Sequence, residues 1–178
     1  MFSNYIDILS NCSKTILKDM GNIDITDVTV KQEKCLSVTY SIAHFIHYED
    51  PKNKVKGDFI LGFVDDSEAV PLATAITENI GLSAVEKFDE IISDVINEFL
   101  NTLAGHFATK CCKNGLYVNV SPAIVSQNKK IQISDMSNTV VYLISLDFAP
   151  GTIKPEFKAE DLSLMVTFTK TGDDELPE

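Results

Sequence analysis

The longest helical pattern in the chain covers residues 88–107 and has two distinct faces. Large apolar residues recur at spacings of three and four, so at about 100° per residue they fall on one side of a helix. This apolar side consists of Phe88, Ile92, Val95, Ile96, Phe99, Leu103 and Phe107. We therefore predict an amphipathic helix that buries this side and leaves the opposite side open.

The opposite, polar side of this helix contains Asp94, Glu98, Asn101 and Gly105. Asn is a poorer helix former than Ala by roughly 0.6 kcal/mol, and Gly is poorer by about 1 kcal/mol. Glu98 and Asn101 lie one turn apart, so their side chains can reach the same object. A solvated helix face with incidental residues is the plain alternative, and the spacing alone does not exclude it.

The remaining pattern of apolar and polar positions predicts two more helices and a sheet. The helices are expected at residues 5–20 and 67–79, and the strands at 24–32, 35–48, 57–64, 116–120, 140–148 and 162–169. Runs of strands beside separate helices favour an α+β fold, with a mostly antiparallel sheet covered on one face by long helices in two layers. We expect one domain over residues 1–170 and an acidic, disordered tail over 171–178.

The net charge of the chain limits the classes of partner that it is expected to bind. The formal net charge is −11 at pH 7, which argues against a nucleic-acid or anionic-membrane partner. All 15 basic residues are lysine, and the sequence contains no arginine. Because Arg is the usual bidentate clamp for phosphate, we do not expect the chain to bind a nucleotide of its own. Any phosphate chemistry would require a partner that supplies the counter-charge.

The cysteines and the apolar segments indicate a reduced, cytoplasmic protein without a membrane span. No apolar run approaches 18 residues, and the N-terminus lacks the charge and apolar pattern of a signal peptide. The cysteines show no metal or redox spacing, and we interpret them as free thiols. They are Cys12, Cys35, Cys111 and Cys112.

The histidines do not suggest a metal site or a nucleophile. His44 and His47 lie three residues apart in a predicted strand, which places them on opposite faces. His106 is five and six residues before Cys111 and Cys112, and neither spacing brings the groups together on a helix. The sequence also lacks a nucleophile elbow, a Gly-rich phosphate loop and an H-E-x-x-H motif. We therefore expect no cofactor or metal ion of the chain's own.

The spacing Asp94-x3-Glu98-x2-Asn101, followed by Pro122, resembles the signature of the CheC/CheX family of chemotaxis phosphatases. Glu-x-x-Asn alone occurs by chance in many helices, so the surrounding residues matter. A small-residue pair ending in Gly105 and a Ser-Pro pair ending in Pro122 both fall at fitting distances.

One residue departs from the family pattern, and the number of motifs distinguishes between the two branches of the family. His106 stands where the family commonly has Asn, just beyond the expected contact face. The helix predicted at residues 67–79 contains Glu78 and Asn79 but no Glu-x-x-Asn, so only one such site is present. One site favours the CheX pattern over the two-site CheC pattern.

The resemblance implies a phosphatase that acts on the phospho-aspartate of a CheY-like receiver domain. It assigns Asn101 to positioning the attacking water and Glu98 to docking on the receiver's lysine. Asp94 and Gly105 are expected to contact the partner, and Mg²⁺ is expected on the receiver. The alternatives are a non-catalytic CheX-like module that binds a receiver or a flagellar-switch protein, and an unrelated α+β domain.

Oligomeric state is not determined by the sequence. Some members of the family pair through the edges of their sheets. By analogy we expect that a homodimer, if one forms, uses an exposed strand, and residues 140–148 are the strongest candidate.

Overall fold

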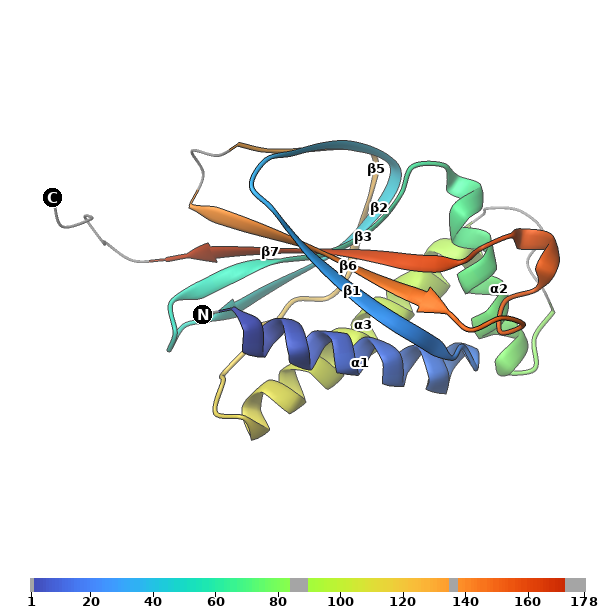
Figure 1. The fold of residues 1–178 in the computed structure, drawn as a ribbon, viewed down its shortest axis with the longest axis horizontal. Coiled ribbons are helices and arrows are strands. Elements are labelled where there is room, and N and C mark those ends of the chain that lie inside the picture. Colours follow the sequence, from blue (N-terminus) through green and yellow to red (C-terminus); the bar gives the residue numbers. More distant parts are fainter. Residues whose placement is uncertain (1, 84–89, 135–137, 172–178) are drawn as a thin grey trace, which may run out of the picture.

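The computed structural model describes residues 2–83, 90–134 and 138–171, and within them a sheet of seven strands carries three helices on one face (Figure 1). The helices are α1 (Ser3–Gly21), α2 (Val70–Asn79) and α3 (Glu90–Lys113). The strands are β1 (Ile25–Glu33), β2 (Leu36–Asp50), β3 (Val55–Phe63), β4 (Asn119–Val120), β5 (Ile124–Ile133), β6 (Thr139–Phe148) and β7 (Asp161–Lys170). The predicted fold class is confirmed.

The strands are arranged in the order β1-β6-β7-β3-β2-β4, and β5 also pairs with β2. All of these pairs are antiparallel. One edge of the sheet is therefore β1, and the other is shared by β4 and β5. The prediction that residues 140–148 form an exposed edge was wrong, because β6 is hydrogen-bonded to β1 on one side and to β7 on the other.

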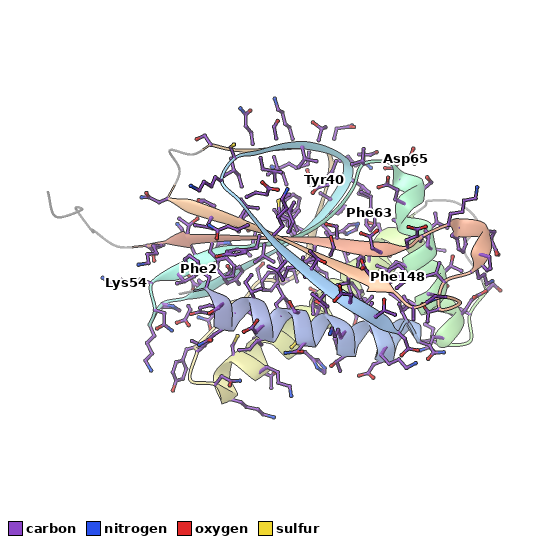
Figure 2. The ribbon with its side chains drawn as sticks, in the orientation of Figure 1. Phe2, Tyr40, Lys54, Phe63, Asp65 and Phe148 are labelled. Carbon is purple, nitrogen blue, oxygen red and sulfur yellow. The ribbon has the colours of Figure 1, made fainter. Side chains whose placement is uncertain are left out.

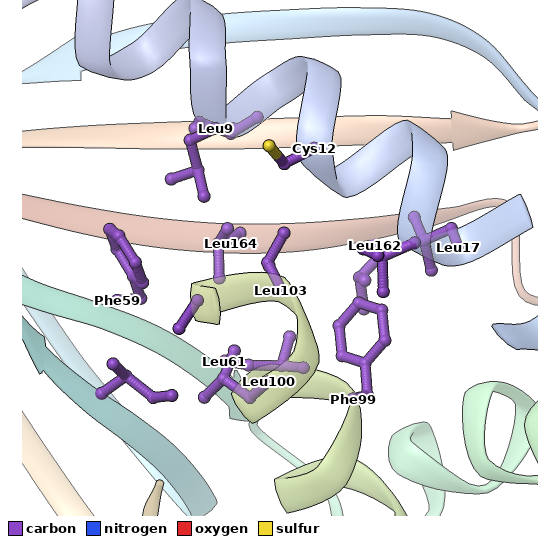
Figure 3. Close-up of a cluster of buried hydrophobic side chains, with 14 of the residues drawn as sticks. Leu9, Cys12, Leu17, Phe59, Leu61, Phe99, Leu100, Leu103, Leu162 and Leu164 are labelled. Carbon is purple, nitrogen blue, oxygen red and sulfur yellow. The ribbon is translucent and has the colours of Figure 1, made fainter. Parts of the chain in front are cut away.

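The main core lies between the helices and one face of the sheet (Figure 3). Burial of this apolar surface is the dominant favourable contribution to folding. The close-up shows α1, α3 and the sheet meeting through Leu9, Cys12, Leu17, Phe59, Leu61, Phe99, Leu100, Leu103, Leu162 and Leu164. The predicted buried face of α3 is confirmed, with Val95 only half-buried and Phe88 outside the described residues. Among the described residues, α2 packs on this core together with the two long helices, α1 and α3.

A second, smaller core covers the opposite face of the sheet, on which the described residues place no helix. Its buried members are Ala43, Ile60, Ile131, Val141 and Met165. Tyr40 packs against this cluster on the side of the strands away from α1 (Figure 2). A Cβ atom added to Gly62 would lie 2.5 Å from the Tyr40 ring, so only glycine allows the ring to lie there.

The structure adds one strand that the sequence pattern does not predict. Residues 124–133 form β5, whereas the strand expected at 116–120 is reduced to the two residues of β4. Most side chains of β5 are exposed on either face, so its sequence shows no regular alternation. Asn128 has a positive φ of 49°, which further interrupts the strand pattern. The expected tail begins at Thr171, and residues 172–178 lie outside the described part.

Asp50 is a buried carboxylate that joins α1 to the turn between β2 and β3 and to the segment between α3 and β4. It lies at the end of β2 and is fully buried. The Tyr5 hydroxyl donates to its Oδ2 at 2.8 Å, and the Tyr117 N–H donates to the same oxygen at 3.2 Å. Asn53 donates from its backbone at 3.1 Å and from its side chain at 2.8 Å.

Burial by itself raises the pKa of Asp50, but hydrogen bonds to the charged form, led by those from Asn53 and Tyr5, lower it below the ordinary value of 3.8. We predict that Asp50→Ala lowers the free energy of unfolding by about 2–4 kcal/mol, because it leaves buried donors without an acceptor. Urea unfolding followed by circular dichroism measures this loss. Glu49→Ala, at the exposed neighbouring position, is the control, and an equal loss in both variants would contradict the prediction.

Candidate functional site

The outward face of α3 presents the residues that the sequence singled out. Asp94, Glu98, Asn101 and Gly105 are all exposed, and the three polar side chains follow one another at helical spacing. Ala104, the small residue before Gly105, is buried instead and packs in the core. The row is therefore an open surface, which suits a macromolecular partner better than a small enclosed substrate.

The side chain of Asn101 is held in one orientation by the backbone. The Ala123 N–H, in the segment between β4 and β5, donates to the Asn101 Oδ1 at 2.8 Å. Because an N–H must face an acceptor, this contact determines which end of the amide is oxygen. The Nδ2 group makes no hydrogen bond with any residue in the described part of the chain. Asn101 therefore offers two N–H donors outward from a fixed position.

Ser121 attaches this segment to the sheet. Its N–H donates to the His47 carbonyl of β2 at 2.8 Å, and its Oγ accepts from the His47 N–H at 3.0 Å. The same hydroxyl donates to the Pro122 carbonyl at 3.1 Å. The ring of Pro122 fixes its own φ and removes a competing N–H. Together these contacts place the next N–H, that of Ala123, opposite Asn101.

The charged residues of this face have no counter-charge in the described part of the chain. Glu98 and Asp94 form no ion pair or hydrogen bond with residues 2–83, 90–134 or 138–171. With Glu90 they form an acidic row at intervals of four residues along α3. A Cβ atom added to Gly105 would meet nothing within 4 Å, so the fold itself does not require glycine there.

A buried histidine supports the turn of α3 that carries Glu98. The His44 ring on β2 is fully buried, and its Nδ1 lies 2.8 Å from the Asn97 Oδ1 of α3. Its Nε2 is buried without a hydrogen-bond partner in the described residues. Burial lowers the pKa of His44, although the hydrogen bond to Asn97 acts in the opposite direction. His47 is exposed on the other face beside Asp58, as the strand spacing predicted.

This arrangement can orient a small polar molecule at Asn101 beside a free carboxylate. The exposed row contains two carboxylates, an amide and a glycine, and it has no hydroxyl or thiol group. Among the described residues no three His, Cys, Asp or Glu side chains gather as a metal site. No described helix is long and apolar enough to cross a membrane.

Comparison with known families identifies the chain. The family profile of the chemotaxis phosphatase CheX matches residues 52–147, which is more than half of the sequence. The chain belongs to the CheX family of chemotaxis phosphatases. The matched region includes the whole of the exposed row and the Ser121–Ala123 segment that holds Asn101. None of the curated proteins matches the sequence significantly.

Solved structures share the fold of this CheX-family chain at low sequence identity. A CheC-like superfamily protein from Shewanella sp. PV-4 has a TM-score of 0.67 and 18% identity, over 94% of this chain and 99% of that one. The CheX–CheY–BeF3–Mg²⁺ complex from Borrelia burgdorferi has a TM-score of 0.64 and 18% identity, and the match covers 93% of this chain and 98% of that one. FliY from Thermotoga maritima has a TM-score of 0.57 and 14% identity, and the match covers 96% of this chain and 88% of that one.

The structure places some of the predicted residues side by side and adds others. Glu98 and Asn101 lie on one exposed face of α3, and Asn101 is hydrogen-bonded to Ala123, the residue after the Ser121–Pro122 pair. The roles of these residues stay predictions. Sequence reasoning missed the Ala123 N–H, which is a backbone group and leaves no signal in the sequence. It also missed Asn97, whose partner His44 lies 53 residues away.

The depressed pKa of His44 predicts how stability depends on pH. The folded state favours neutral imidazole, so as the pH falls through the ordinary value near 6.5 the unfolded chain takes up the proton first. The free energy of unfolding is therefore highest above this value and decreases as the pH is lowered from 7 to 5. We expect His44→Gln to flatten that decrease in urea unfolding measured at several pH values. An unchanged slope in the variant would contradict the assignment to His44.

Proposed function

We propose that this CheX-family chain is a phosphatase that hydrolyses the aspartyl phosphate of a CheY-like receiver domain. The observation that carries the proposal is the orientation of the Asn101 amide. The amide oxygen of Asn101 accepts a hydrogen bond from the Ala123 N–H, and the N–H groups of the amide face outward. Family membership supports the class of reaction. The complex of a CheX with CheY from Borrelia burgdorferi supports the class of partner.

The role of Asn101 in this proposal is to orient water. An outward N–H of Nδ2 donates to the oxygen of a water molecule, which keeps a free lone pair directed at phosphorus. The water oxygen forms the new P–O bond while the bond between phosphorus and the receiver's aspartate oxygen breaks. The products are inorganic phosphate and the free carboxylate. An amide is a poor base, so Asn101 supplies position and not proton removal.

Glu98 is proposed to determine the register of docking. Its carboxylate is exposed and has no counter-charge within the described fold, so it is available to a lysine of the receiver. A charge-assisted hydrogen bond of this kind is roughly twice as strong as a neutral one. Asp94 lies one turn before Glu98 on the same face and is proposed to contact the rim of the partner. The Mg²⁺ ion and the phosphate's other counter-charges belong to the receiver, which is consistent with a chain that has no arginine.

The role of the Asn101 amide can be tested by substitution. We expect Asn101→Ala to lower kcat by about 100-fold, because the water is no longer positioned. Its dissociation constant for a BeF3⁻-activated, Mg²⁺-loaded receiver should remain nearly unchanged. The measurement is the lifetime of the acyl phosphate on purified receivers from the same genome, with catalytic amounts of the chain. Turnover near that of the unaltered chain would exclude the positioning role.

Two further variants sharpen this experiment. Asn101→Asp keeps an acceptor for the Ala123 N–H but has no N–H to donate, so it should lose turnover as Asn101→Ala does. Glu98→Gln keeps its shape but loses its charge, so it should weaken receiver binding as well as turnover. If the unaltered chain binds a receiver without shortening the lifetime of the phosphate, the non-catalytic docking module is the correct function.

A separate prediction concerns Gly105. Gly105→Ala should raise the free energy of unfolding by about 0.5–1 kcal/mol, because glycine disfavours a helix and the site has room for a methyl group. The same change should raise KM for the receiver, because the methyl group stands where the partner approaches. Urea unfolding and initial rates measure the two effects. His106→Ala, beside the face, is the control, and a stabilised variant with an unchanged KM would remove Gly105 from the contact surface.

A further inference from the structure

Two apolar side chains are exposed beside the acidic row of α3. Ile91 on α3 is 60% exposed, and Val125 on β5 is 45% exposed. Ile91 lies seven residues before Glu98, two turns away on the same face of the helix. Single exposed apolar residues are common on proteins. These two are distinguished by their positions: Ile91 shares a helix face with Glu98, and Val125 lies two residues beyond Ala123, whose N–H holds Asn101.

The pairing of β5 with β2 determines the direction of Val125. Val125 lies opposite His44, whose ring contacts Asn97 of α3. Residues directly opposite on antiparallel strands share a face of the sheet, so Val125 faces the side that carries α3. It follows Ala123 by two residues, which is about 6.6 Å along a strand. Val125 therefore lies close to the N–H that holds Asn101.

The neighbouring residue points the other way. Ile124 lies opposite Phe45, which packs against the cluster on the helix-free face. Because side chains alternate along a strand, Ile124 is directed away from α3 although it is 66% exposed. Ile124 and Val125 are thus similar in chemistry and adjacent in sequence, yet only Val125 faces the proposed docking surface.

The fold gains little from these two side chains. Ile is β-branched and loses rotamer freedom in a helix, so an exposed helix position does not favour it. Val125 leaves nearly half of its surface in water beside a strand with mostly polar residues. Apolar groups around a polar centre exclude water when a partner covers them. Each also contributes binding free energy in proportion to the apolar area that it removes from water.

We propose that Ile91 and Val125 are apolar anchors that determine which receiver domain the chain accepts. The inference rests on the proposed function, because the occupant is the same receiver that Asn101 would serve. Ile91 and Asn101 are ten residues apart, or about 15 Å along the helix. A partner that meets both anchors and the acidic row must therefore be a folded surface. It presents apolar groups to the two anchors and a cationic side chain to the acidic row.

The experiment compares three single variants of the full chain. Ile91→Thr, Val125→Thr and Ile124→Thr each replace a β-branched residue by another, so helix and strand preferences change little. Binding is measured with the BeF3⁻-activated, Mg²⁺-loaded receiver that the turnover assay selects. We expect Ile91→Thr and Val125→Thr each to weaken binding by about 10-fold and to raise KM rather than lower kcat. Ile124→Thr should bind as the unaltered chain does.

The outcomes separate this inference from the proposed function. If the unaltered chain binds and hydrolyses but neither Ile91→Thr nor Val125→Thr weakens binding, the anchors are excluded while the function stands. Equal weakening by Ile124→Thr and Val125→Thr also overturns the proposal, because orientation then has no effect. If the unaltered chain neither binds nor hydrolyses any receiver phosphate, the function fails and the inference fails with it. Circular dichroism and urea unfolding of each variant identify any loss that comes from misfolding.

Discussion

The hydrogen bond from the Ala123 N–H to the Asn101 Oδ1 is the contact on which the site depends. An exposed Asn on a helix would otherwise sample several rotamers and compete for nearby backbone groups. The contact joins two segments that are 22 residues apart and gives the amide a single direction. Its donor is itself held, because Ser121 is hydrogen-bonded to His47 in both directions. The orientation of one side chain on α3 is thus determined by a strand of the sheet.

This dependence explains why the site lies at the edge of the sheet. β4 and β5 both pair with β2, and the segment between them is free to turn toward α3. A central strand would have its N–H groups committed to neighbours on both sides. The edge also leaves β5 beside α3, so a partner that reaches Asn101 meets strand and helix together. Beneath them, His44 and Asn97 connect β2 to the same turn of the helix.

The spacing of apolar and polar residues predicted those features that depend on neighbouring residues in the sequence. The apolar face of α3 follows from a repeat that one helix must bury, and the Glu98–Asn101 spacing is a property of the same helix. The order of strands is a non-local property, and for that reason residues 140–148 were wrongly expected at an edge. The sequence did not predict β5, because an exposed edge strand does not need alternating apolar and polar residues. A backbone donor such as the Ala123 N–H can be found only once the chain is folded.

Two glycines show how the structure separates the demands of folding from those of function. A Cβ atom at Gly57 would lie 1.7 Å from the Thr167 carbonyl oxygen, to which the Tyr48 hydroxyl donates at 2.6 Å. Gly57 is therefore required by the packing of β3 against β7. Gly105 has no neighbour within 4 Å and adopts a helical conformation in which Ala would be more stable. Glycine at position 105 therefore costs helix stability without a contact in the described fold that requires it, and the close approach of a partner that we propose would account for it.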